Sequence, residues 1–105
     1  MSSNIRHAAK RDANEAVIVE YLRKSGCSVD RLSGTGIPDL IVGFHGHNIL
    51  MEVKMPGKKL RPAQEDWHSW WLGQKAVVET VDDAGMVLDR FKDLVFKARL
   101  AGVLE

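Results

Sequence analysis

The sequence predicts an α/β domain in which a central mixed β-sheet is flanked by helices. Three observations predict it. Apolar residues recur at helical spacing near the start, in the third quarter and near the end of the chain; short apolar runs suited to strands lie between these segments; and Gly- or Pro-containing stretches separate them. The expected order is α-β-β-β-α-β-α. A chain of 105 residues suits one domain over 1–105 with a single modest core.

The first helix is expected over residues 5–25, with Gly26 as its stop. Four apolar side chains fall on one arc of this helix: Ile18, Val19, Tyr21 and Leu22. The run CSVDRLS that follows predicts a short strand, and the stretch SGTGIP predicts a loop. The glycines of this loop suit either a plain turn or a close approach of the main chain to a ligand such as DNA.

Two further strands, DLIVGF and NILMEVK, are expected to form a hairpin through a tight turn at Gly46. Because side chains alternate between the faces of a strand, Glu52 and Lys54 share a face and lie roughly 6–7 Å apart. The hairpin also returns Asp39 to the end of the sheet where Glu52 and Lys54 lie. The sequence therefore predicts two carboxylates and an ammonium group at one end of the sheet.

The second half of the chain begins with the basic loop MPGKKLRPAQ, and Pro62 suits the first turn of the next helix. Three tryptophans at i, i+3 and i+4 spacing on this helix are expected in the core rather than as platforms for base stacking: Trp67, Trp70 and Trp71. The run KAVVETV predicts a strand. A last helix is expected to begin near Asp82 or Asp83, either of which suits a cap. Its expected inner face carries Val87, Phe91, Leu94, Val95 and Ala98.

Composition excludes several classes of protein. No apolar run approaches the roughly 20 residues that span a bilayer, so no membrane association is expected, and the first residues lack the apolar core of a secretory signal. Cys27 is the only cysteine, so no internal disulfide forms, which fits a reducing cytoplasm. The net charge of +1 does not by itself indicate a nucleic-acid partner. Locally, basic side chains cluster at 54–61 and near the N-terminus, at Arg6, Lys10 and Arg11; a solvated loop is the plain alternative.

Two carboxylates that meet at one end of a sheet repel each other and favour a bound cation. Oxygen ligands suit Mg²⁺ or Mn²⁺, which also bind phosphate oxygens. Such a cation activates water and stabilises charge on a phosphate, and a nearby lysine orients the attacking water or offsets the developing charge. Asp39, Glu52 and Lys54 therefore suit the hydrolysis of a phosphodiester. Taken singly, Asp39 also suits the end of a loop, and Glu52 with Lys54 an ordinary ion pair.

These residues resemble the motif of the PD-(D/E)xK nuclease superfamily, with Pro38-Asp39 followed by Glu52-Val53-Lys54. The closer resemblance is to its VRR-NUC (virus-type replication-repair nuclease) branch. It rests on GIPDL at 36–40, MEVK at 51–54, Gln64 three residues before Trp67, and the segment from Lys75 through VDDA at 81–84. It covers nearly the whole chain. The resemblance implies a restriction-endonuclease-like core and a Mg²⁺-dependent deoxyribonuclease.

The resemblance also implies roles for single residues. Asp39 and Glu52 become metal ligands with the backbone carbonyl of Val53, and Lys54 becomes the catalytic lysine. Glu15 matches a glutamate that the family places at the site from its first helix, and its helical angle turns it toward the sheet, where a buried acid needs a partner. Gln64 matches the motif glutamine. A solvated Glu15 and a merely polar helix start at Gln64 are the plain alternatives.

The expected partner is DNA, without a small-molecule cofactor. Its phosphates would be positioned by Lys58, Lys59 and Arg61, with help from Lys10 and Arg11. Contacts of this kind carry no sequence information, so cleavage of branched DNA such as four-way junctions or flaps is favoured over restriction of a specific sequence. The size resembles single-domain phage and bacterial members of the family, which places the protein in the cytoplasm of a bacterial or phage-infected cell.

Three further expectations concern assembly and alternatives. Cutting two symmetric strands needs two sites, which a twofold homodimer supplies, and Phe96 and Leu100 are candidates for its interface. The alternative is a module of the same fold that binds nucleic acid, or serves in an assembly, without catalysing a reaction. His45 and His47 lie at the turn, away from Asp39, where a turn role is favoured over metal binding.

Overall fold

The structure is a computed structural model that describes residues 11–102. Its elements follow the expected order, with three helices and four strands in the described part of the chain. The helices are α2 (Glu15–Lys24), α3 (Pro62–Trp70) and α4 (Val81–Leu100), and the strands are β1 (Ser28–Arg31), β2 (Leu40–Phe44), β3 (His47–Val53) and β4 (Lys75–Val78). The prediction of an α/β domain with a mixed sheet is confirmed.

The four strands form one sheet in the order β1-β2-β3-β4. The pairs β1–β2 and β2–β3 are antiparallel, and β3–β4 is parallel. The hairpin between β2 and β3 closes through a two-residue turn, and both His45 (φ 48°) and Gly46 (φ 83°) are left-handed there. This is the backbone that a primed turn requires, and it matches the twist of the strands.

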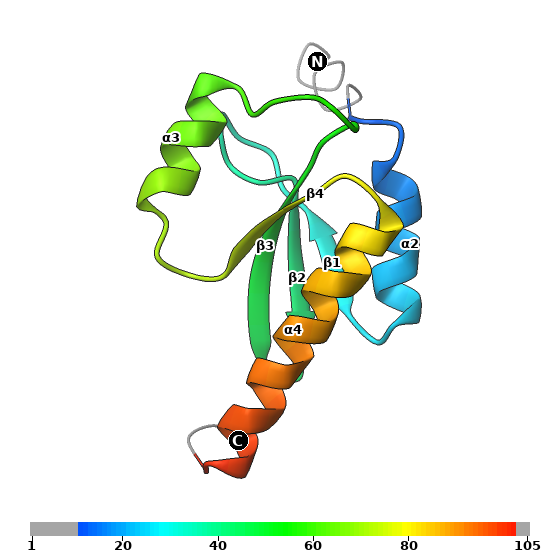
Figure 1. The fold of residues 1–105 in the computed structure, drawn as a ribbon, viewed down its shortest axis with the longest axis vertical. Coiled ribbons are helices and arrows are strands. Elements are labelled where there is room, and N and C mark those ends of the chain that lie inside the picture. The colour runs from blue at the N-terminus through cyan, green and yellow to red at the C-terminus, as the bar shows by residue number, and fades with distance from the viewer. Residues whose placement is uncertain (1–10, 103–105) are drawn as a thin grey trace.

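One face of the sheet is packed against α2 and α4, which lie side by side (Figure 1). Alternate residues of β2 and β3 point into this core, including Leu40, Val42 and Met51, all at 0% exposure. From α2, the core receives three of the four predicted residues: Ile18, Val19 and Leu22. Helix α3 lies apart from the other two helices, across the strands in this view (Figure 1).

Three expectations about the helices need correction. Residues 11–14 are not helical, so within the described residues the first helix begins only at Glu15. The cap of α4 is Thr80, whose hydroxyl accepts from the Asp83 N–H, and neither Asp82 nor Asp83 holds that position. On α4, Leu94 is 59% exposed, and Leu88 is buried in the core instead.

Of the three tryptophans expected in the core, only Trp67 is buried, at 8% exposure, whereas Trp70 is 56% exposed. Trp67 stacks on Trp71 with ring centroids 5.0 Å apart. This aromatic group lies outside the main core cluster. No helix within residues 11–102 is long and apolar enough to cross a bilayer.

Candidate active site

Asp39 and Glu52 face each other where β2 begins and β3 ends. The register pairs Leu40 with Met51, so the next step along the hairpin sets Asp39 opposite Glu52. A carboxylate oxygen of Asp39, Oδ2, accepts a hydrogen bond of 2.8 Å from the Val53 N–H. The hairpin thus delivers the two predicted carboxylates to one place, and a main-chain donor orients the first of them.

The side chain of Glu52 is 2% exposed, although it points away from the apolar core face. Its Oε2 accepts a hydrogen bond of 2.8 Å from the amide nitrogen of Gln64. Its Oε1 is buried and has no hydrogen-bond partner. An acceptor left in this state is costly unless a proton or a ligand satisfies it.

The environment of this carboxyl pair favours the protonated form. Burial, followed by the nearby charge of Asp39, raises the pKa of Glu52 from 4.5 to about 8, against smaller opposing effects of Lys54 and Arg61. Burial also raises the pKa of Asp39, although the Val53 N–H opposes this. The environment of these two close carboxyl groups therefore favours a shared proton between them, or a cation in its place.

Gln64 connects Glu52 to Lys54. While its amide nitrogen donates to Glu52, its Oε1 accepts from the Lys54 ammonium at 3.2 Å and from the Arg61 main-chain N–H at 2.8 Å. The glutamine is 5% exposed. Its three hydrogen bonds fix one orientation of the amide, and that orientation holds the lysine beside the carboxyl pair.

Gly36 brings α3, and with it Gln64, close to the carboxyl pair. Its φ of +80° is left-handed, and a Cβ at this position would meet the Ala63 carbonyl oxygen at 2.6 Å. Only glycine permits both the backbone conformation and this close approach. The structure thus gives the loop glycine an internal contact, to the helix that carries Gln64.

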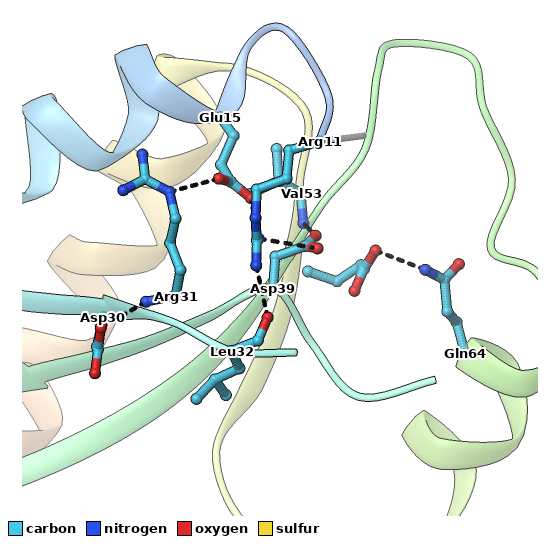
Figure 2. A network of polar contacts seen from close by, with 9 residues as sticks. Arg11, Glu15, Asp30, Arg31, Leu32, Asp39, Val53 and Gln64 are labelled. Carbon is cyan, nitrogen blue, oxygen red and sulfur yellow. Dashed lines mark hydrogen bonds and ion pairs between the residues drawn. The ribbon is translucent and has the colours of Figure 1, made fainter. Parts of the chain in front are cut away.

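Glu15 lies buried at the start of α2, 3% exposed, between two arginines. Its Oε2 accepts from Arg11 Nη1 and its Oε1 from Arg31 Nε, both at 2.8 Å (Figure 2). Arg11 also donates to the Leu32 carbonyl at 2.7 Å and lies 3.7 Å from Asp39 Oδ1. This arrangement differs from two predictions: both oxygens of Glu15 are bound to arginines rather than free for a metal, and Arg11 is engaged within the protein rather than free for DNA.

Two residues of this region were not anticipated. Arg31 sits at the end of β1, opposite Leu40, and this pairing carries it to Glu15. The side-chain amide of Asn14 donates to the carbonyls of Lys54, at 3.0 Å, and Glu79, at 2.6 Å, and so ties the start of α2 to the ends of β3 and β4. The pattern of the sequence offers no signal for either contact, because both depend on how the loops close.

The residues present fit a divalent cation. Asp39 and Glu52 supply carboxylate oxygens, one of them buried without a partner. The Val53 carbonyl is a third candidate, because the register continued by two residues sets Val53 opposite Pro38, whose nitrogen has no hydrogen to donate. Within 11–102, no three His, Cys, Asp or Glu side chains are grouped closely enough to hold a metal by themselves, so a carbonyl or water ligand is part of this fit.

No protein-family model and no curated protein matches this chain. The site holds a carboxyl pair with raised pKa values, a lysine beside it and a buried glutamine that bonds to Glu52 and Lys54.

The other predicted residues lie around this centre or away from it. Lys58, Lys59 and Arg61 are exposed on the segment between β3 and α3, next to the site. Lys10 and Arg6 lie outside the described residues. His45 and His47 are at the opposite end of the hairpin, and Nδ1 of His45 is 3.0 Å from the Arg99 guanidinium. The basic loop thus adjoins the site, whereas the two histidines do not.

Proposed function

We propose that this domain is a Mg²⁺- or Mn²⁺-dependent endonuclease that hydrolyses phosphodiester bonds of DNA. We further propose that it has a restriction-endonuclease-like core and belongs to the VRR-NUC branch of the PD-(D/E)xK nucleases. One observation carries the proposal: Gln64 donates to Glu52 and accepts from Lys54, so that a carboxyl pair and an ammonium group are held together at one end of the hairpin. This combination suits attack of water on a phosphate.

Asp39, Glu52 and the Val53 carbonyl would hold the cation. When bound, it polarises the phosphate and activates water for attack. Asp39 is oriented for this task by the Val53 N–H, and Glu52 by Gln64. Lys54, fixed by the same glutamine, orients the attacking water and offsets the charge that develops on the phosphate oxygens.

Exposed Lys58, Lys59 and Arg61 support a DNA substrate, because they lie on the segment that leads from Lys54 to Gln64. Contacts to phosphates position DNA without reading its bases. We therefore propose cleavage directed by DNA structure, at four-way junctions or flaps. A twofold homodimer would supply the second site. Both of its suggested contacts are exposed, Leu100 at 89% and Phe96 at 45%, although the Phe96 ring also packs against Phe44.

The test is a cleavage assay with labelled four-way junction, flap and linear duplex DNA in Mg²⁺, Mn²⁺ or EDTA. Lys54→Ala and Asp39→Asn should abolish cleavage, and Lys97→Ala, an exposed lysine paired with Asp93 on α4, is the matched control. Cleavage that survives EDTA or either site substitution would refute the mechanism. Folded, metal-loaded protein that binds these DNAs and cuts none of them would establish a binding module instead.

A further inference from the structure

Each oxygen of the Glu15 carboxylate accepts a hydrogen bond from an arginine. Arg11 and Arg31 each approach one of its oxygens at 2.8 Å, and the side chain is 4% exposed. A carboxylate buried with two guanidinium groups does not exchange them freely for a cation, because removing one partner leaves an uncompensated buried charge. Glu15 is therefore an anchor for arginines.

Arg11 occupies the position between Glu15 and Asp39. The same nitrogen, Nη1, lies 2.8 Å from Glu15 Oε2 and 3.7 Å from Asp39 Oδ1. The other terminal nitrogen donates to the Leu32 carbonyl at 2.7 Å, which fixes the guanidinium in place (Figure 2). A cation that bridged these two carboxylates would need the volume that this guanidinium fills.

Once cation binding has removed the proton of the Asp39–Glu52 pair, the formal charges of the side chains linked here by hydrogen bonds and ion pairs balance. Three carboxylates and three basic side chains meet here: Glu15, Asp39 and Glu52 with Arg11, Arg31 and Lys54. One divalent cation between Asp39 and Glu52 would add a charge that a bound phosphodiester partly offsets. A second divalent cation would add an excess that no further described carboxylate of this cluster neutralises.

We propose that Arg11, anchored by Glu15 and the Leu32 carbonyl, takes the place of a second metal ion, so that this site binds one divalent cation. Arg11 then acts as a positioning residue for Asp39, and Arg31 holds Glu15 for it. This inference rests on the proposed function for the cation itself, and the number of bound ions tests it without any substrate.

Mn²⁺ binding to the full chain, measured by calorimetry and by electron paramagnetic resonance without DNA, should give one ion for the native protein. Arg11→Met should give two, because it frees Glu15 Oε2 and Asp39 Oδ1 around the vacated position. Arg90→Met, at an exposed arginine of α4, is the matched control and should give one. Two ions in the native protein, or one in folded Arg11→Met, would overturn the proposal.

Glu15→Gln provides a second measurement that does not depend on how well Arg11→Met folds. It should leave one ion bound with an affinity within about tenfold of the native value, and Arg11→Met combined with Glu15→Gln should return the count to one. A larger loss of affinity in Glu15→Gln would make Glu15 a direct ligand and overturn the proposal. A single bound ion without DNA cleavage would refute the nuclease and leave the ion count intact, whereas no bound Mn²⁺ would refute both.

Discussion

Gln64 donates a hydrogen bond to Glu52 at 2.8 Å, and the same amide group accepts one from Lys54 at 3.2 Å. The two motif residues that the strand places on one face are thus joined by a side chain from another element, α3. The glutamine is nearly inaccessible, at 5% exposure. A buried amide held by three hydrogen bonds is a stiff connector, so the geometry of the site depends on where α3 begins.

Gln64→Ala should therefore weaken both the fold and the activity. It leaves the Glu52 Oε2 and the Arg61 N–H without their partner, a loss of about 1–3 kcal/mol in the free energy of unfolding. Urea denaturation measures it, and DNA cleavage should fall because Lys54 loses its support. The control is Gln74→Ala, which removes only a 3.3 Å bond to the Asn48 carbonyl. Equal effects of the two substitutions would contradict the connecting role.

Stability should decrease as the pH rises through the titration of Glu52. Burial beside Asp39 raises its pKa to about 8, against 4.5 for an exposed glutamate. Between these values the folded protein retains a proton that the unfolded chain has lost, so the free energy of unfolding falls with increasing pH, by on the order of 5 kcal/mol in total. Urea denaturation in EDTA from about pH 5 to about pH 9, a range that covers most of the interval between those pKa values, measures this slope.

Glu52→Gln tests the origin of that slope, because the glutamine has no proton to titrate. Most of the pH dependence should disappear, and the variant should be the more stable protein at alkaline pH. Mn²⁺ should stabilise the native protein most at alkaline pH, since the cation competes with the shared proton. An unchanged slope in Glu52→Gln would assign the pH dependence to other groups.

The sequence predicted the carboxyl pair because a hairpin has few degrees of freedom. Once the turn lies at Gly46, period-two alternation and antiparallel pairing dictate that Asp39 returns to Glu52. The order of elements could be predicted for a similar reason, because each helix or strand shows its own hydrophobic periodicity in the sequence. Local patterns of this kind need no knowledge of the rest of the fold.

The arginine contacts could not be predicted in this way. Arg31, at the end of β1, reaches Glu15 on α2, and Arg11 reaches the Leu32 carbonyl across 21 positions of the chain. Asn14 occupies the N-cap position of α2, but its Oδ1 accepts no capping hydrogen bond, while its amide nitrogen donates to the carbonyls of Lys54 and Glu79. Hydrogen bonds between distant segments therefore outweigh the local capping preference of asparagine at this position. Such bonds depend on the folded positions of the loops and cannot be predicted from the local sequence.

Gly36→Ala should damage the site more than a turn substitution of equal backbone strain. Both Gly36 (φ +80°) and Gly46 (φ +83°) are left-handed, but only at Gly36 would a Cβ meet main chain, the Ala63 carbonyl at 2.6 Å. Gly46→Ala should cost about 1–2 kcal/mol through backbone strain alone. Gly36→Ala should cost more and also reduce cleavage, because it pushes α3 and Gln64 away from Glu52. Similar unfolding free energies and full cleavage in both variants would argue against this.

The basic loop should reveal itself in the salt dependence of DNA binding. Lys58 and Lys59 are exposed beside the site, and each phosphate contact contributes about 0.9 to the slope of log affinity against log salt. Lys58→Ala with Lys59→Ala should therefore lower that slope by about 2 on duplex arms, measured by fluorescence anisotropy with Asp39→Asn protein to prevent cleavage. Lys24→Ala with Lys97→Ala removes two equally exposed lysines that pair with acids on α2 and α4. If both double variants change the slope equally, the loop has no special contact with phosphate, and net charge alone attracts the DNA.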